Sequence, residues 1–261
     1  TIDPERLENK IAEEGQGAVV TIPVNTGADV VVGELDGQTV KFMEDNQAVL
    51  EIRTDRGAYT LPAQQINIGA VAERIGATSD LEDIKVHIEI AEPTAEQAQV
   101  VENAAAEGTF SIVVPPLEFS VTASYGDTVV EVSKFSAYVE RLIAVPDGTD
   151  PSRITTGIVV EPDGTVRHVP TKIVVIDGKY YAQINSLTNS TYSVVWHPVE
   201  FADVADHWAK DAANDMGSRL VVAGADGGRF DPERGMTRAE FAAVIVRALG
   251  LRPENGASAF T

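Results

Sequence analysis

Between residues 110 and 196 the chain carries nine short runs rich in β-branched and aromatic residues, and none of them has helical spacing. Runs of this length and type are typical of β-strands. Asp163-Gly164 and Asp177-Gly178 separate consecutive runs, and Asp-Gly favours hairpin turns. The sequence therefore predicts a sheet-rich region with strands at 110–114, 118–124, 129–132, 138–145, 158–161, 167–169, 172–176, 180–184 and 192–196.

The part before residue 110 mixes helices with strands. Asp3-Pro4 opens a predicted helix to residue 13, and Thr94 with Gln97 forms a capping box before a helix over 98–106. Further helices are predicted around 40–44 and over 62–76. Strands are predicted at 18–23, 28–32, 48–54, 58–61 and 85–90.

The fold class is therefore expected to be α+β. An α+β region at 1–115 precedes a β-rich region at 116–198, and Pro115-Pro116 is the candidate seam between them. Whether the two regions form one domain or two stays open. Residues 199–251 then return to helical spacing, as a helix–loop–helix unit.

The charge of the chain excludes several classes of partner. The net charge is −20, and most of it lies in residues 1–200, where 31 acidic residues face 13 basic ones. Such a chain lacks the basic surface that binds nucleic acid or anionic membranes.

The chain also lacks several features of other protein classes. It has no cysteine, which excludes disulfides and thiol catalysis. No apolar run approaches the ~20 residues that span a bilayer. Without an initiator Met or signal-peptide pattern, the chain is expected to be a piece of a longer protein.

No catalytic motif stands out. The four histidines have no His-Glu-x-x-His spacing, and the chain has no Gly-x-Ser-x-Gly elbow or phosphate loop. Carboxylates are abundant, but acidic residues spread over a soluble surface are the default. We expect no enzyme activity in this chain, although the parent protein is free to carry an enzyme upstream.

The helix–loop–helix unit carries several short motifs. Asp206 is the expected N-cap of its first helix, with either Trp208, Ala212 and Met216 or Ala209 and Ala213 facing inward. Thr237 and Glu240 form a capping box before the second helix, whose predicted apolar stripe is Phe241, Val244, Ala248 and Leu249. Gly224 is expected to have a positive φ.

The motifs occur in an order that resembles a known family. They are Phe201-Ala202-Asp203-Val204, Asp206-His207-Trp208-Ala209, Gly224, Asp226-Gly227-Gly228-Arg229-Phe230-Asp231-Pro232, Thr237-Arg238-Ala239-Glu240-Phe241 and Arg247-Ala248-Leu249-Gly250-Leu251. Residues 201–251 thereby resemble the S-layer homology (SLH) repeat of Gram-positive surface proteins. Residues 170–198 are similar to the β-rich segment that often precedes such repeats. The chain ends on Phe260-Thr261, so 252–261 are expected to be a linker and the start of a second repeat.

The resemblance implies anchoring by non-covalent binding to secondary cell-wall polysaccharide that bears pyruvate ketals. It implies a secreted protein of the cell wall or S-layer. Arg238 offers a planar fork to the ketal carboxylate, and Thr237 sits where a helix N-terminus presents N–H groups. Trp208 could lie on a sugar ring, and Gly224 could admit a sugar closely.

Each motif residue also has a structural interpretation. Asp203, Asp206 and Glu240 are expected to be caps or turn residues, and Trp208 is as suited to a core as to a sugar platform. No cofactor is expected, and calcium at the Asp226 loop is a minor alternative because the acidic ladder of a calcium loop is missing.

The family normally uses three SLH repeats with ligand grooves between neighbours, so this chain is expected to bind weakly without further repeats of its parent or of other chains. The alternative is that 1–198 is not a spacer but a carbohydrate-binding or accessory module of a wall-bound glycoside hydrolase. Its candidate platform is Tyr180, Tyr181, Tyr192 and Trp196, although Tyr180 and Tyr181 would point to opposite faces of a strand.

Overall fold

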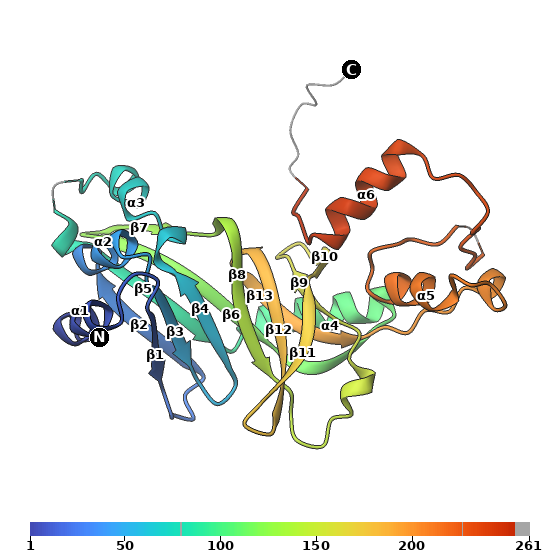
Figure 1. The fold of residues 1–261 in the computed structure, drawn as a ribbon, viewed down its shortest axis with the longest axis horizontal. Helices are drawn as coiled ribbons and strands as arrows, with labels where there is room; N and C mark the ends of the chain where they lie inside the picture. Colours follow the sequence, from blue (N-terminus) through green and yellow to red (C-terminus); the bar gives the residue numbers. More distant parts are fainter. Residues whose placement is uncertain (79, 226, 254–261) are drawn as a thin grey trace.

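Two β-sheets form the centre of the molecule (Figure 1), in a computed structural model that describes residues 1–78, 80–225 and 227–253. The first sheet has six strands. In spatial order they are β1 (Val19–Pro23), β3 (Val49–Arg53), β4 (Gly57–Pro62), β8 (Lys134–Ala144), β12 (Lys179–Thr188) and β11 (Thr171–Ile176). Only the β1–β3 pair is parallel among the described pairs of this sheet.

The second sheet has seven strands, all antiparallel in their described pairs. In order they are β10 (Val166–Val169), β9 (Thr156–Val160), β13 (Ser190–Trp196), β6 (Ser111–Tyr125), β5 (Lys85–Ala91) and β2 (Val30–Asp36), with β7 (Thr128–Glu131) also paired to β6. The turn between β11 and β12 has positive φ at both Asp177 and Gly178, as the hairpin prediction requires.

The candidate seam at Pro115-Pro116 lies inside one continuous strand, so the two separate strands predicted on either side of it are wrong. β6 runs through both prolines because its ladder to β13 shifts register there: Leu117 pairs with Tyr192, but the next pair is Val114 with Val194. A β-bulge tolerates proline, which has no amide to donate. Residues before and after this point supply strands to the same two sheets, which favours the alternative of one domain.

Helices cover the ends and faces of the sheets. They are α1 (Pro4–Glu14), α2 (Gly37–Asp45), α3 (Ile68–Ile75) and α4 (Ala95–Gly108), with short 3₁₀ turns at Ala63–Gln65, Leu81–Asp83 and Pro151–Arg153. The predicted caps Asp3 and Thr94 are confirmed. The single helix predicted over 62–76 is wrong, because Asn67 takes a left-handed φ of 54° and its side chain caps a new helix at Ile68.

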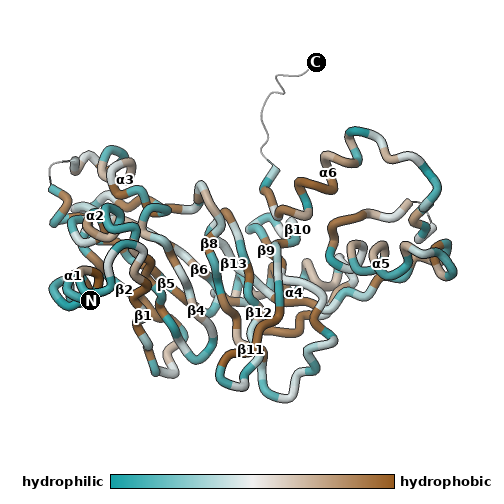
Figure 2. Tube along the Cα trace, in the orientation of Figure 1, coloured by the Kyte–Doolittle hydropathy of each residue, from teal (hydrophilic) through white to brown (hydrophobic). Residues whose placement is uncertain are grey.

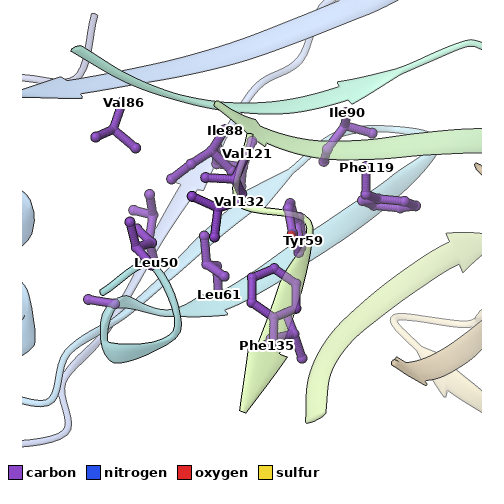
Figure 3. Packing of buried hydrophobic residues seen from close by; sticks show 14 of the residues in the cluster. Leu50, Tyr59, Leu61, Val86, Ile88, Ile90, Phe119, Val121, Val132 and Phe135 are labelled. Atoms are coloured by element: carbon purple, nitrogen blue, oxygen red, sulfur yellow. The ribbon is translucent and has the colours of Figure 1, made fainter. Parts of the chain in front are cut away.

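One hydrophobic core joins α1 to the two sheets. It contains residues from Leu7 to Val194, and its tightly packed centre includes Tyr59 and Phe119, whose ring centroids are 5.3 Å apart (Figure 3). Figure 2 shows hydrophobic residues along many of the strands and also along α6. None of the helices among the described residues has the length and apolar character needed to cross a membrane.

Arg141 is fully buried in this core. Its guanidinium lies 4.8 Å from the ring centroid of Tyr192 and 5.0 Å from that of Tyr59. It donates to the carbonyl of Thr188 and to the side-chain oxygen of Asn189, each at 2.8 Å. Oxygen dipoles and aromatic faces therefore surround the charge, and among the described residues no carboxylate pairs with it.

The C-terminal part is a helix–loop–helix unit, as predicted, so the α+β class is confirmed. It consists of a 3₁₀ turn (Ala202–Val204), α5 (Lys210–Ser218) and α6 (Arg238–Ala248). Its own core is small, with Phe201, Val204 and Ala213 buried. α6 buries no side chain, so the stripe predicted on it remains largely uncovered.

Candidate functional site

The start of α6 is built by a capping box and an ion pair. Thr237 Oγ1 accepts the amide of Glu240 at 3.2 Å, and the Glu240 carboxylate accepts the amide of Thr237 at 2.8 Å. Arg234 approaches the same carboxylate with two nitrogens, at 2.7 and 3.2 Å. The Arg234 guanidinium and the Thr237 donors lower the pKa of Glu240 to about 2. The carboxylate is therefore occupied within the protein.

Arg238 has a different position from the other arginines of the unit. Arg219 pairs with Asp215, and Arg229 pairs with Asp231. Arg238 is the first residue of α6 and is exposed, and within the described residues its guanidinium has no hydrogen bond or ion pair. It is therefore available to a ligand, next to the positive end of the helix dipole. Arg247, at the other end of α6, is also exposed and without such a partner in the same residues.

Trp208 lies on the surface, with 91% of its area exposed. Of the two sets of residues predicted to face inward, the one with Trp208 is wrong, and so is the N-cap role of Asp206. Turns continue through residue 209, and α5 begins only at Lys210. The side chain that accepts an amide near this start is His207, whose Nδ1 lies 3.2 Å from the amide nitrogen of Ala209. Of the residues predicted to face inward, Ala213 is buried.

The Trp208 turn is connected to the segment before α6. His207 packs its ring against that of Trp208, with centroids 5.4 Å apart, and its Nε2 lies 3.3 Å from a carboxylate oxygen of Glu233. Glu233 is the neighbour of Arg234, which holds Glu240. No local pattern in the sequence indicates the ion pairs of His207, Glu233 and Arg234, because they depend on how the loop folds back.

Asp203 fixes the loop between the helices. Its two carboxylate oxygens accept the amides of Phe230 at 2.8 Å and Asp231 at 2.7 Å. These hydrogen bonds lower the pKa of the Asp203 carboxyl below its usual value, and the one from the amide of Phe230 has the largest effect. The same loop packs Phe230 against Phe201, with ring centroids 5.5 Å apart.

Gly224 is needed for space rather than for backbone conformation. Its φ is not positive, so that expectation is wrong. A Cβ at this position would lie 2.6 Å from Cε1 of Phe201 and 2.9 Å from the carbonyl oxygen of Arg229. The ring of Phe201 therefore occupies the place of a side chain at residue 224.

The four predicted ligand residues are distributed over three segments. Thr237 and Arg238 are neighbours at the start of α6, while Trp208 precedes α5 and Gly224 follows it. Among the described residues no hydrogen bond, ion pair or ring contact joins Trp208 or Gly224 to the start of α6. Of the four residues, the chain therefore brings together Thr237 and Arg238, and the indole of Trp208 stands apart from them.

The sequence also suggests two other candidate sites, a calcium site at the Asp226 loop and an aromatic platform for sugar. No group of three His, Asp or Glu in the described residues is placed to hold a metal ion, and Asp226 lies outside them. The aromatic platform does not form a row: Tyr192 is fully buried, and Arg153 lies 4.3 Å above the ring of Trp196. Phe260-Thr261, the predicted start of a second repeat, also lies outside the described residues.

Comparison with known proteins agrees with the motifs. Residues 200–242 match the S-layer homology domain family. Amylopullulanase from Thermoanaerobacterium thermosulfurigenes is 33% identical over 91 residues, which are 33% of this chain and 5% of the relative. Exoglucanase XynX from Acetivibrio thermocellus is 37% identical over 68 residues, 26% of this chain and 6% of the relative. Endo-1,4-beta-xylanase A from Thermoanaerobacterium saccharolyticum is 35% identical over 75 residues, 29% of this chain and 6% of the relative.

The chain thus spans only about one twentieth of the length of these relatives. No solved structure matches it. The family match covers the turn of Trp208, the Asp203-bound loop and the start of α6, which are the segments whose geometry is described above. Residues 200–242 of this chain are therefore an S-layer homology domain, a module of cell-surface proteins that are anchored to the cell wall.

Proposed function

We propose that the SLH unit anchors its parent protein to a Gram-positive cell wall by binding secondary wall polysaccharide through pyruvate ketals. The observation that carries this proposal is the guanidinium of Arg238 at the first position of α6, which is exposed and has no partner within the part of the chain that the structure describes. A ketal-linked pyruvate presents a carboxylate, and a planar guanidinium binds carboxylates in a two-pronged geometry.

The backbone at the start of α6 adds donors to the guanidinium. The capping box uses the amides of Thr237 and Glu240, and leaves those of Arg238 and Ala239 directed out of the first turn. Two amides, a guanidinium and the helix dipole together favour an anion. Trp208, exposed on the turn before α5, offers its flat face to a sugar ring.

The surrounding charge bears on how this site binds. The chain has a net charge of −20, so an acidic polymer is not attracted over long range. Binding then depends on contacts at the start of α6, and added salt is expected to weaken it only moderately. The proposed site needs no calcium, because the guanidinium of Arg238 and the positive end of the α6 dipole supply the positive charge for the ligand carboxylate.

The exposed face of α6 supports the participation of further repeats. Phe241 is 59% exposed, and Ile245 and Leu249 are also exposed, at positions four residues apart on one side of the helix. We propose that another SLH repeat, of the parent or of another chain, covers this face and completes the ligand groove. A single repeat supplies half of that groove, so this chain binds weakly.

The experiment compares this chain with a version extended through all repeats of its parent. Both are titrated by calorimetry against pyruvylated wall polymer and against the same polymer after removal of the ketals. We expect the extended version to bind at least tenfold more tightly, and removal of the ketals to abolish binding by both. Equal affinity of the two versions would refute the shared groove, and equal binding of both polymers would refute recognition of pyruvate.

The role of residues 1–198 is proposed to be that of a structural spacer at the cell surface. The three relatives are named as polysaccharide-degrading enzymes, which supports the proposal that the parent carries such an activity in another region. Burial of Tyr192 and the Arg153 side chain above Trp196 speak against a sugar platform on this region. A glycan-array screen of the whole chain with Arg238→Ala separates the alternatives, because an accessory module would still bind its own glycan.

A further inference from the structure

We propose that the β-rich region acts as an orienting platform, which holds α6 by the carbonyl groups at its C-terminal end. The hydroxyl of Tyr138, on β8, donates to the carbonyl oxygen of Leu249 at 2.6 Å. The guanidinium of Arg167, on β10, donates to the carbonyl oxygen of Gly250. These bonds connect residues more than eighty positions apart, so they join two parts of the fold.

A third side chain completes the set. The ring of His168, next to Arg167 on β10, lies near the backbone of Ala248 and interacts with it electrostatically. Its Nδ1 lies 2.8 Å from Oγ1 of Thr156 on β9. The neutral ring makes this hydrogen bond when Nδ1 accepts from the hydroxyl. Two consecutive carbonyls, those of Leu249 and Gly250, are therefore held by hydrogen bonds from the platform, and His168 lies beside the residue that precedes them.

The contact is close enough to require glycine. Gly250 is buried and has a φ of +62°. A Cβ there would lie 2.9 Å from the carbonyl oxygen of His168 and 3.2 Å from Cα of Val169. The backbone that ends α6 therefore rests directly on the backbone of β10.

The chemistry of the platform suits the end of a helix. The last carbonyls of a helix lack partners within the helix and carry a partial negative charge. Arg167 is buried and is held in place by Glu161 and by Thr188 Oγ1, each at 3.2 Å. The first helix of the unit has a similar contact at its C-terminal end: Nδ1 of His197, which follows β13, lies 2.8 Å from the carbonyl oxygen of Ser218, the last residue of α5.

Docking at one end determines where the other end points. α6 buries no side chain of its own, so these terminal bonds hold it in place. Figure 1 shows the C-terminal end of α6 beside β10 and its first turn directed away from the sheets. At 1.5 Å per residue, the 11 residues of α6 carry Arg238 about 16 Å from the contact. The platform therefore presents the start of α6 outward at a fixed angle.

The test measures the orientation of α6 directly by electron–electron resonance between two spin labels. The chain has no cysteine, so Glu107→Cys on α4 and Ala242→Cys on α6 supply unique, exposed labelling sites. Gly250→Ala is introduced to disrupt the contact. The matched control is Gly228→Ala, which has a similar φ of +74° but nothing within 4 Å of its Cβ. Tyr138→Phe removes a single hydrogen bond without altering the backbone.

We expect one narrow distance distribution in the doubly labelled chain without a further substitution and in Gly228→Ala, and a broad one in Gly250→Ala. Tyr138→Phe should accelerate hydrogen exchange of the α6 amides about fivefold, as expected for loss of one ordinary hydrogen bond. A broad distribution in the doubly labelled chain without a further substitution, or an unchanged one in Gly250→Ala, would overturn the proposal. Unchanged hydrogen exchange of the α6 amides in Tyr138→Phe would also overturn it. These measurements use no polysaccharide, so their outcome is separate from that of the anchoring proposal.

Discussion

Arg234 and Glu240 form a fork at the start of α6, with nitrogen-to-oxygen distances of 2.7 and 3.2 Å, while Arg238 beside them has no partner among the described residues. The two arginines are four residues apart but have different roles. Arg234 pairs with the carboxylate that caps the helix, so the carboxylate of Glu240 is already occupied within the protein. The helix start is thus closed on one side and open to an anion on the other.

The Thr237 cap can be tested by substitution. Thr237→Ala removes the oxygen that accepts the Glu240 amide, so we expect α6 to lose about 1 kcal/mol of stability. Thr237→Ser keeps that oxygen and should behave as the parent does. Hydrogen exchange of the α6 amides measures the difference, and equal protection in the two variants would show that the cap contributes nothing.

Gly224 offers a test of packing in the loop. Gly224→Ala places a methyl group 2.6 Å from the ring of Phe201, and overpacking of this kind costs roughly 1–3 kcal/mol. Gly235→Ala is the matched control, because nothing lies within 4 Å of its Cβ and its φ is not positive. Limited proteolysis of the SLH unit should quicken in the first variant only; matching rates would contradict the assigned contact.

His168 makes stability depend on pH. Burial, with a smaller contribution from the positive charge of Arg219, lowers the pKa of its imidazole to about 4 from the ordinary 6.5. Between these values the unfolded chain binds a proton that the folded chain does not, so stability falls as the pH falls from 6.5 to 4. Between pH 6.5 and 5 the loss should be roughly 2 kcal/mol.

Urea denaturation at pH 5, 6 and 7 measures this slope in the parent and in His168→Asn. The variant should have a shallower slope, because its amide does not titrate, even though its stability at pH 7 is lower. A slope that the substitution leaves unchanged would mean that protonation of His168 does not oppose folding.

Arg141 should be critical for the stability of the two-sheet core. Arg141→Met keeps most of the volume but removes the charged donor from the carbonyl of Thr188 and the side-chain oxygen of Asn189, which keep only the hydroxyls of Tyr192 and Tyr59. We expect a loss of about 3 kcal/mol in urea denaturation. Arg6→Met, on the exposed side of α1, is the control and should change stability by less than about 0.5 kcal/mol. Losses of similar size in both would argue that the buried charge is dispensable.

The local elements of this fold could be predicted well from the sequence. Capping residues such as Asp3 and Thr94 are recognised from their own neighbours, and alternation at 85–90 indicates a half-buried strand. The break at Asn67 could not be predicted, because a left-handed asparagine is stabilised by the folded chain around it. The passage of β6 through Pro115-Pro116 depends on a bulge opposite β13, which no local pattern reveals.

The site was predicted in part. The capping box at Thr237 and Glu240 follows from spacing alone. The exposure of Trp208 does not, because a large aromatic residue near a helix start is equally compatible with a buried position. Arg234, Glu233 and His207 form pairs that depend on the path of a loop, and the docking of Gly250 on β10 joins segments about eighty residues apart. Long-range contacts of this kind have no signature within a single sequence.

The central claim is that the guanidinium of Arg238 binds an acidic group of the wall polymer. The most direct measurement is binding of this chain to immobilised pyruvylated wall polymer, compared between Arg238→Ala and Arg247→Ala. Both arginines are exposed, lie on α6 and lack an ion pair in the described part of the chain, but only Arg238 is at the helix start. We predict a more than tenfold loss of binding for Arg238→Ala, as for removal of a charge-assisted hydrogen bond, and no change for Arg247→Ala. Equal binding by both variants would contradict the account.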